Sequence, residues 1–363
     1  MSRPARLARV RARMAELGID TLLLSLGADL PWLTGYHAMP LERLTMLVLP
    51  ADGDATLVVP ALEAPRVDAD DAVFALRPWD ETEDPVALVA DLVRGGRLAV
   101  SDRTWATFVL QLQARLPAAS WLAASAVTAP LRAVKDAAEV VALRRASAAA
   151  DRVAVELLAG RVPLIGRTEA EVSADLSRRL VAEGHAAVNF AIVGSGPNSA
   201  SPHHEAGGRR IQAGEAVVCD FGGTLDGYCS DTTRTVFTGP PPAEFRHLYA
   251  VLQEAQQAAV EAAVVGTACE DVDGVARRII TEGGYGPHFI HRTGHGIGLE
   301  EHEDPYLVGG NCESLVAGHA FSVEPGIYLA GRWGARIEDI VVATTDGPEP
   351  LNLTSHDLAV VEA

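Results

Sequence analysis

Two stretches of the chain repeat one pattern that ends in an acidic residue. Residues 211–222 read IQAGEAVVCDFG and residues 315–326 read LVAGHAFSVEPG, so an Ala-Gly pair, an apolar run, an acid and a glycine recur with the same internal spacing. The acid is Asp220 in the first copy and Glu324 in the second. Each acid ends a short apolar run that is typical of a buried strand.

A second acid follows each copy after a turn. Asp231 lies in CSDTTRTV and Glu338 lies in ARIEDIVV, and both segments read as strands. Two such hairpins facing each other would bring four carboxylates to one place. Like charges packed this closely are costly unless cations lie between them. The pattern therefore predicts a site for two divalent metal ions, which would neutralise the four charges.

One further ligand is expected from the segment HRTGHGIGLEEHE, which begins at residue 291. His295 lies between glycines there, and glycine lets an imidazole and its backbone approach a metal closely. One histidine with four carboxylates is an oxygen-rich set that suits Mn best, with Co, Fe or Zn as alternatives. A hydroxide could bridge two ions that lie about 3.5–4 Å apart and act as the nucleophile, while the ions polarise a carbonyl. This arrangement indicates metal-assisted hydrolysis.

Neighbouring residues could orient these ligands or assist the reaction. Thr233 lies two residues after Asp231, and Arg336 lies two before Glu338, so each is expected to share a strand face with its own acid and to orient it. His203 and His302 lie outside the ligand set and could donate to a developing oxyanion. The alternative for each histidine is a satisfied loop residue.

Composition excludes several classes of function. The 363 residues carry a formal net charge of -18, which argues against nucleic acid as a partner. The first twenty residues carry arginines at helical spacing without an apolar block, so they predict an opening helix rather than a signal peptide. No apolar run approaches the ~20 residues of a membrane span. The four cysteines lack paired spacing, which points to a reducing cytoplasm.

The elements that must position the acids fall into two expected domains. Residues 1–129 alternate helix and strand patterns, which predicts an α/β domain without a ligand cluster. The segment from Trp32 to Arg43 is expected to be a surface loop. Pro130 marks the boundary to residues 130–363. There, helical patterns, a capped helix starting at Thr168 and two helices between the repeats predict an α+β domain with an internal pseudo-two-fold.

Five stretches of the second domain resemble a known family, the pita-bread metallopeptidases, and specifically the Xaa-Pro branch that holds proline dipeptidase and aminopeptidase P. They read PHHEAG, VVCDFGGTLDGYCSDTTRTV, HRTGHGIGLEEHEDPY, FSVEPGIYLAGRWG and ARIEDIVV. The N-terminal domain resembles the creatinase-like domain of the same family. The resemblance implies a creatinase-like α/β domain followed by a pita-bread catalytic domain.

The resemblance also implies a division of the metal ligands. Asp220 is expected to bind one ion, Asp231 and Glu338 to bridge both, and His295 and Glu324 to bind the other. Glu324 is implied to carry the proton of the attacking water as well.

Four further residues receive roles from the resemblance. His203, which matches the family spacing to the first metal acid better than His204, and His302 are implied to act on the tetrahedral intermediate. His291 is implied to line the pocket for proline. Arg336 is implied to buttress the bridging glutamate at the substrate site.

The implied reaction is hydrolysis of the peptide bond before proline. The substrate would be an Xaa-Pro dipeptide, or a longer peptide with an N-terminal Xaa-Pro, depending on whether the far end of the site captures a carboxylate. Arg332, Trp333 or a neighbouring subunit could decide this, because a homodimer or larger homo-oligomer is expected. A methionine-aminopeptidase-like peptidase and a metal-free binding or scaffold relative remain the alternatives.

Overall fold

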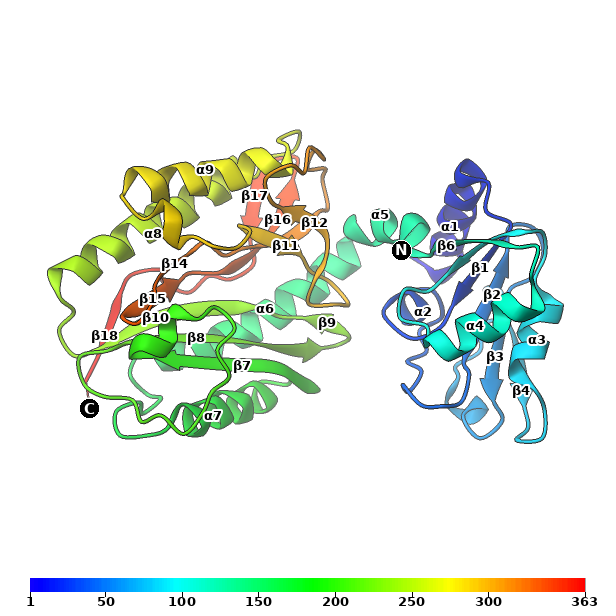
Figure 1. The fold of residues 1–363 in the computed structure, drawn as a ribbon, viewed down its shortest axis with the longest axis horizontal. Coiled ribbons are helices and arrows are strands. Elements are labelled where there is room, and N and C mark those ends of the chain that lie inside the picture. The colour runs from blue at the N-terminus through cyan, green and yellow to red at the C-terminus, as the bar shows by residue number, and fades with distance from the viewer. Residues whose placement is uncertain (363) are drawn as a thin grey trace. The chain divides into compact units, whose positions relative to one another are not determined.

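The protein forms two compact units in a computed structural model that describes residues 1–362 (Figure 1). The first unit is Met1–Arg132, and the second begins at Ala133. The expected boundary between residues 129 and 130 falls inside helix α5 (Ser125–Ala133), which continues through Pro130. Among the described residues, no helix is both long and apolar enough to cross a membrane.

The first unit is built on one mixed sheet of six strands. Their order is β4-β3-β2-β1-β5-β6, with antiparallel pairing from β1 to β3 and parallel pairing elsewhere. The strands are β1 (Thr21–Leu24), β2 (Met46–Pro50), β3 (Thr56–Pro60), β4 (Ala75–Trp79), β5 (Arg97–Val100) and β6 (Ser120–Ala123), and the helices are α1 (Arg3–Leu17), α2 (Asp29–Thr34), α3 (Pro85–Leu92) and α4 (Ala106–Arg115), with a 3-10 turn η1 (Ala64–Arg66).

Helix α2 corrects the expectation of a surface loop for its first residues, up to Thr34, whereas residues 35–43 lie outside any helix or strand as expected. Trp32 lies within this helix and is only 3% exposed, and Tyr36 just after it is buried as well. The helix has six residues and ends at Gly35, whose φ of 75° is left-handed. So short a helix contains no repeat of the helical period, which is why its pattern resembled that of a loop.

The second unit begins with a half made of two helices and a sheet. Helices α6 (Ala137–Leu158) and α7 (Glu169–Ala182) both start with capping boxes, including the one predicted at Thr168. The sheet runs β18-β10-β8-β7, with β9 paired to β8. Its strands are β7 (Ala187–Ser195), β8 (Ala216–Leu225), β9 (Tyr228–Cys229), β10 (Thr232–Thr238) and β18 (Ala359–Val361), and the 3-10 turn η2 (Gly196–Ala200) follows β7.

The other half repeats this order of elements. Helices α8 (Ala243–Ala262) and α9 (Cys269–Glu282) are the two helices predicted between the repeats. The sheet runs β12-β11-β13-β16-β17, and β14 and β15 form a separate hairpin. These strands are β11 (Gly294–Gly296), β12 (Glu303–Leu307), β13 (Ala320–Val323), β14 (Gly326–Leu329), β15 (Trp333–Arg336), β16 (Asp339–Thr344) and β17 (Gly347–Pro350), with a 3-10 turn η3 (Gly286–His288).

The sequence repeat corresponds to two equivalent antiparallel pairs, β8 with β10 and β13 with β16. The repeated glycines, Gly214 and Gly318, adopt φ values of 83° and 97° in the turns before β8 and β13, a conformation that glycine adopts without strain. An antiparallel bridge between Thr233 and Glu338 joins the two pairs directly. The internal repeat therefore sets two acid-bearing strand pairs against each other.

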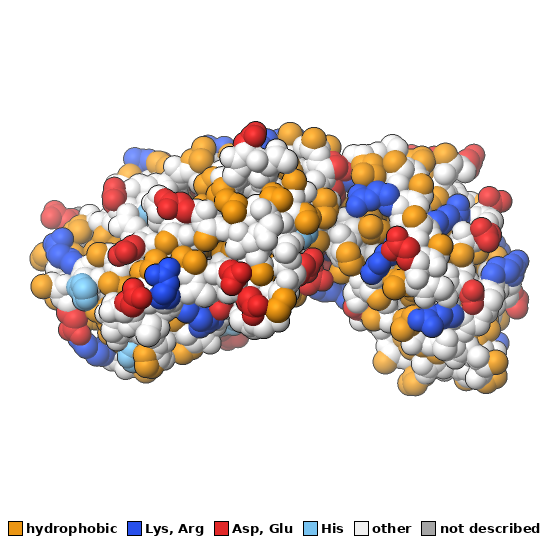
Figure 2. All heavy atoms as spheres, turned by 90° about the horizontal axis from the view of Figure 1, so that it is seen from above, with side chains coloured by type: hydrophobic (Ala, Val, Ile, Leu, Met, Phe, Trp, Pro, Cys, Tyr) orange, Lys and Arg blue, Asp and Glu red, His pale blue; other side chains and the backbone are white. Residues whose placement is uncertain are grey.

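Separate apolar clusters support the two halves. One packs α6 and α7 against the first sheet, and the other packs α8 and α9 against the second, in agreement with the helices flanking the strands in Figure 1. Charged side chains of both signs are mixed over the face shown in Figure 2. In each half, the strands that carry the acids thus pack against the apolar faces of two helices.

Candidate metal centre

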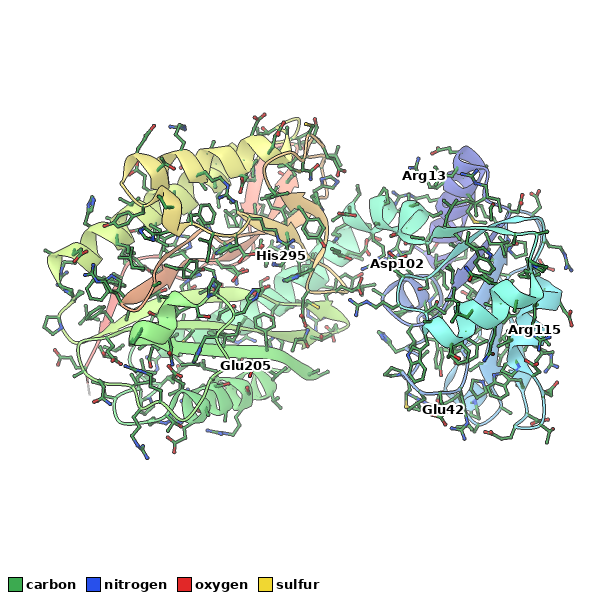
Figure 3. All side chains as sticks on the ribbon, viewed as in Figure 1. Arg13, Glu42, Asp102, Arg115, Glu205 and His295 are labelled. Atoms are coloured by element: carbon green, nitrogen blue, oxygen red, sulfur yellow. The ribbon has the colours of Figure 1, made fainter. Side chains whose placement is uncertain are left out.

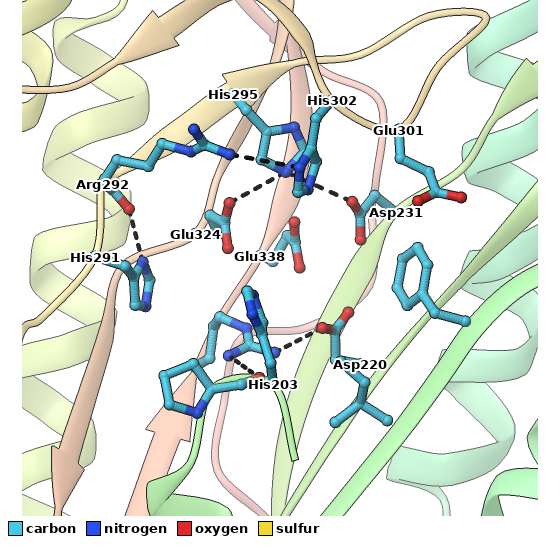
Figure 4. Close-up of a pocket in the computed structure, with 14 residues that line it drawn as sticks. His203, Asp220, Asp231, His291, Arg292, His295, Glu301, His302, Glu324 and Glu338 are labelled. Atoms are coloured by element: carbon cyan, nitrogen blue, oxygen red, sulfur yellow. Dashed lines mark hydrogen bonds and ion pairs between the residues drawn. The ribbon is translucent and has the colours of Figure 1, made fainter. Parts of the chain in front are cut away.

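The nine residues predicted from the sequence as metal ligands, catalytic residues or substrate-binding residues all line one cavity in the second unit. Its volume is about 440 Å³, and Figure 4 shows the acids gathered near its middle with histidines around them. The cavity is lined by Phe190, Ile192, Pro202, His203, Asp220, Asp231, His291, Arg292, His295, Glu301, His302, Glu324, Arg336 and Glu338. Residues far apart in the chain therefore meet at one site.

The four acids occupy the equivalent strands of the repeat. Asp220 lies within β8 and Glu324 directly follows β13, whereas Asp231 and Glu338 directly precede β10 and β16. Asp220, Asp231 and Glu338 are each less than 9% exposed. The fold thus encloses carboxylates that would otherwise be solvated.

His295 projects from β11 into this cluster, and Figure 3 shows it in the interior of the second unit. Its Nδ1 lies 3.1 Å from the carbonyl oxygen of Gly296 and donates to it, which directs Nε2 toward the acids. That Nε2 lies 3.2 Å from Glu324 Oε1 and 3.8 Å from Asp231 Oδ2. Ligand atoms of Asp231, His295 and Glu338 lie within 4.8 Å of one another.

The charges of this cluster fit a bound cation. Burial raises the pKa of Asp231 and of Glu338 well above their ordinary values, and the neighbouring carboxylates raise it further. Burial also favours the neutral form of Glu324, but the His295 imidazole outweighs it and holds the pKa of that carboxyl at about 2. Asp220 Oδ1 is buried and has no hydrogen-bond partner among the described residues. Divalent ions would satisfy all of these groups.

Arg336 has different partners from those expected. Its Nη2 lies 2.6 Å from Asp220 Oδ2, its Nη1 donates to Tyr328 Oη, and its Nε donates to Thr233 Oγ1. It is 2% exposed, and its ion pair among the described residues is with Asp220 instead of Glu338. Arg336 therefore lines the cavity as a buried ion-pair partner, and its donors are engaged by protein groups.

Thr233 orients the acid of the opposite half, which corrects the expectation that it serves Asp231. Its hydroxyl donates to Glu338 Oε2 at 2.6 Å and accepts from Arg336 Nε at 3.0 Å. The reason is the bridge between residues 233 and 338, which puts these two side chains next to each other across the junction. Spacing along one strand could not reveal a partner on another strand.

Arg234 supports the same junction and was not identified from the sequence. It is fully buried, and its guanidinium donates to the backbone oxygen of Glu338 at 2.7 Å and to Asp339 Oδ1 at 2.7 Å. It follows Thr233 in the strand, so it points to the opposite face, away from the cavity. An arginine among the threonines of a predicted strand was the available signal.

The two adjacent histidines of the loop after η2 have different surroundings. His203 lines the cavity, as predicted. His204 is directed to Glu169, with its Nε2 2.8 Å from Glu169 Oε2. Glu169 is fully buried and also accepts from Ser195 and Asn198. Burial favours the neutral form of Glu169, but these hydrogen bonds outweigh it and lower the pKa of this carboxyl. His204 is therefore one of several hydrogen-bond partners of a buried carboxylate and has a structural role.

His302 lies beside the proposed ligand His295, with ring centroids 4.0 Å apart. Desolvation of the ring where it lines the cavity and the adjacent His295 lower the pKa of His302 to about 4, although part of the residue is exposed to solvent, so its imidazole is neutral near pH 7. The ring Nδ1 is approached by Arg292 Nη2 at 3.5 Å. A guanidinium only donates, so this contact favours the tautomer in which Nε2 carries the proton and can donate into the cavity.

His291 lines another wall of the cavity and is fixed by two hydrogen bonds. Its Nδ1 donates to the Arg292 backbone oxygen at 2.7 Å, and its Nε2 accepts from Tyr328 Oη at 2.9 Å. Burial lowers its pKa, which keeps the ring neutral. Phe289 packs edge-on against the same ring. This wall therefore presents a rigid, uncharged surface.

Two charged residues of the cavity were missed from the sequence. Arg292 stacks on Tyr306 at 4.4 Å and forms no ion pair among the described residues, and Glu301 lies across the cavity from it in Figure 4. Both belong to the quoted motif around His295, so their position was the available signal. Arg332, which was considered for capture of the substrate carboxylate, is paired with Glu244 at 2.7 Å.

Family models match both units of the chain. Residues 6–134 match the model of the creatinase/prolidase N-terminal domain, and residues 141–345 match that of metallopeptidase family M24. The creatinase-like domain and the pita-bread domain predicted from the sequence are therefore confirmed.

Named relatives resemble the chain over almost its whole length. It is 46% identical to "Probable dipeptidase PepE" of Mycobacterium bovis, covering 98% of this chain and 96% of that protein. It is 35% identical to "Xaa-Pro dipeptidase" of Lactobacillus delbrueckii subsp. lactis, covering 96% of each. The structure of a prolidase from Thermococcus sibiricus is similar with a TM-score of 0.93 and 35% identity, covering 100% of both chains.

Proposed function

Because the chain belongs to metallopeptidase family M24, we propose that it is a metal-dependent dipeptidase that cleaves Xaa-Pro dipeptides. One observation carries the proposal: four carboxylates and an imidazole converge in a cavity that also holds an arginine without a carboxylate partner among the described residues. The relatives named as dipeptidase and Xaa-Pro dipeptidase support the same substrate class.

The proposed metal ligands are the four carboxylates and the one imidazole at the centre of the cavity. We propose two divalent ions, with manganese the best match to this oxygen-rich set. When bound, they would supply Lewis acidity and a water that ionises near neutral pH. The ligands would be Asp220, Asp231, His295, Glu324 and Glu338.

Three residues would act on the reacting atoms. Glu324 stays ionised because His295 lies beside it, so its carboxylate can accept a proton from the attacking water and pass it to the departing proline nitrogen. His302 would donate through Nε2 to the oxyanion that develops on the scissile carbonyl. His203 would donate to the same oxygen or to the substrate backbone from the facing wall.

The cavity offers opposite charges for the two ends of a dipeptide. Arg292 would bind the carboxylate of the substrate, and Glu301, across the cavity, would attract its ammonium group (Figure 4). The proline ring would pack on the uncharged wall formed by His291. Arg336 is engaged by Asp220 and would hold that ligand in place instead of binding substrate.

The substrate class is tested by comparing one Xaa-Pro dipeptide with its C-terminal amide and with a tripeptide. An ionic hydrogen bond contributes about 1.5–3 kcal/mol, so kcat/KM should fall ~10- to 100-fold when the carboxylate is masked. Arg292→Met should raise KM for the dipeptide and abolish this difference. Arg332→Met, which affects an arginine outside the cavity, serves as the control. Equal turnover of dipeptide and tripeptide would assign an aminopeptidase instead.

The oligomeric state of the protein and its location in the cell are two separate proposals. We expect a homodimer or larger homo-oligomer, and a cytoplasmic location in keeping with four free cysteines. Light scattering of the purified protein tests the first, and fractionation of the producing cells tests the second. A fully active monomer would remove the need for a neighbouring subunit at the site.

A further inference from the structure

The chain contains a single lysine among its 30 lysine and arginine residues, and that lysine is buried. Lys135 is 6% exposed and lies just before helix α6. Lysine is rarely buried without a specific partner, because removing its charge from water is costly. Its position therefore calls for an account of what it contacts.

One partner of Lys135 is the residue that follows His302. Lys135 Nζ lies 2.8 Å from Glu303 Oε1, and the two side chains are only 1% and 8% exposed. Glu303 is the first residue of β12 and pairs with Gly296 of β11. The ion pair thus anchors the end of the turn, residues 297–302, that connects the strand of His295 with His302.

Close packing around the pair restricts its movement. A Cβ atom at Gly298 would lie 2.0 Å from Glu303 Oε1 and 3.0 Å from the Lys135 Cε, so the turn backbone lies directly against the two side chains. The backbone of Lys135 is itself held, because its N–H donates to Gly318 at 2.8 Å. A planar guanidinium would need more room than this contact leaves, which accounts for lysine in an arginine-rich chain.

His302 has few contacts of its own that could hold it. Its one side-chain hydrogen bond among the described residues is the 3.5 Å contact with Arg292, and the residue is solvent-exposed. Adjacent residues of an extended chain point in opposite directions, so Glu303 points to Lys135 while His302 points into the cavity. A donor to an oxyanion must be held within about 0.5 Å of its productive position.

We propose that Lys135 and Glu303 are positioning residues that hold His302 at the metal centre. The inference rests on the proposed function, because it takes His302 as a donor in the reaction. Removing either charge breaks this buried contact between Lys135 and Glu303, which frees the turn to move. Four of the five proposed metal ligands lie at strands that this turn does not join. The fifth, His295, lies on β11, which is also hydrogen-bonded to β13, so we expect metal binding to be retained when the turn moves.

The test compares Lys135→Met and Glu303→Gln in wild-type protein and in a His302→Ala background. Each single change should lower kcat ~10- to 100-fold, with KM and metal content within about twofold of wild type. In the His302→Ala background, either change should have no further effect, because its influence passes through His302. Equal losses in both backgrounds, or an unchanged kcat, would overturn the proposal.

A matched control and a second measurement keep the test independent of the activity assigned. Arg144→Met neutralises an exposed ion pair with Glu349 and should leave kcat unchanged. If wild-type protein cleaves no Xaa-Pro peptide, the proposed function fails, and amide hydrogen exchange then decides the inference. Exchange within residues 297–302 should be at least tenfold faster in Lys135→Met than in wild-type protein, or in Glu303→Gln if Lys135→Met does not fold. Unchanged exchange would refute the proposed positioning role.

Discussion

Substituting Thr233 by valine should weaken metal binding without changing any proposed ligand. The hydroxyl links Glu338 to Arg336, at 2.6 Å and 3.0 Å, and both partners are 2% exposed. Valine has nearly the same shape but cannot hydrogen-bond. Both charged groups would therefore lose a buried partner while the packing of β10 is retained.

The expected size follows from these two contacts. Hydrogen bonds to charged groups contribute about 1.5–3 kcal/mol each, and residues that orient a ligand typically change metal affinity 10- to 100-fold. A loss of about 2–3 kcal/mol would raise the Kd for manganese by ~30- to 150-fold. The measurement is a competition titration against a chelator of known affinity, followed by kcat at saturating metal.

Thr238→Val is the matched control on the same strand. Thr238 is also buried, but its hydroxyl bonds to the backbone of Gln212 and Glu215, at the other end of β10. This variant should lose thermal stability while retaining the wild-type Kd for the metal. A Thr233→Val protein with unchanged Kd, or equal weakening by both variants, would show that orientation of Glu338 by this hydroxyl does not matter.

Two further predictions concern the histidine pair and metal removal. His203→Ala should lower kcat ~10²- to 10³-fold with metal content retained. His204→Ala should chiefly lower the melting temperature, because buried Glu169 loses a partner. Steady-state kinetics and calorimetry distinguish the two variants, and a larger kcat loss for His204→Ala would reverse the assignment. In the metal-free protein, Asp231 and Glu338 have pKa values raised above their ordinary 3.8 and 4.5, so the stability they contribute is present at acidic pH and is lost as pH rises above about 4.5. Urea unfolding after chelation should thus give a lower free energy of unfolding at about pH 8 than at about pH 5, with manganese abolishing the fall; a metal-free protein that gains stability over this range would contradict the reasoning.

Local patterns were sufficient to predict much of the fold and the residues of the centre. The repeated apolar runs identified the strands that carry Asp220 and Glu324, and the capping box at Thr168 identified the start of α7. These features depend on residues close in the chain, where periodicity and capping act. Glycines around His295 were equally informative, because a Cβ at Gly296 would lie 2.1 Å from a neighbouring backbone oxygen.

Partners across the fold were decided by the tertiary structure alone. Strand periodicity tells which face a side chain occupies but not what lies opposite, so Thr233 was assigned to Asp231 although it contacts Glu338. The ion pair between Lys135 and Glu303 joins residues far apart in the chain, and no local pattern encodes it. The sequence by itself determined which acids and histidines could form a metal centre, because their types and strand positions are local properties. Which residues hold them in place depended on how the two halves pack, because hydrogen bonds between strands are set by their relative position in space.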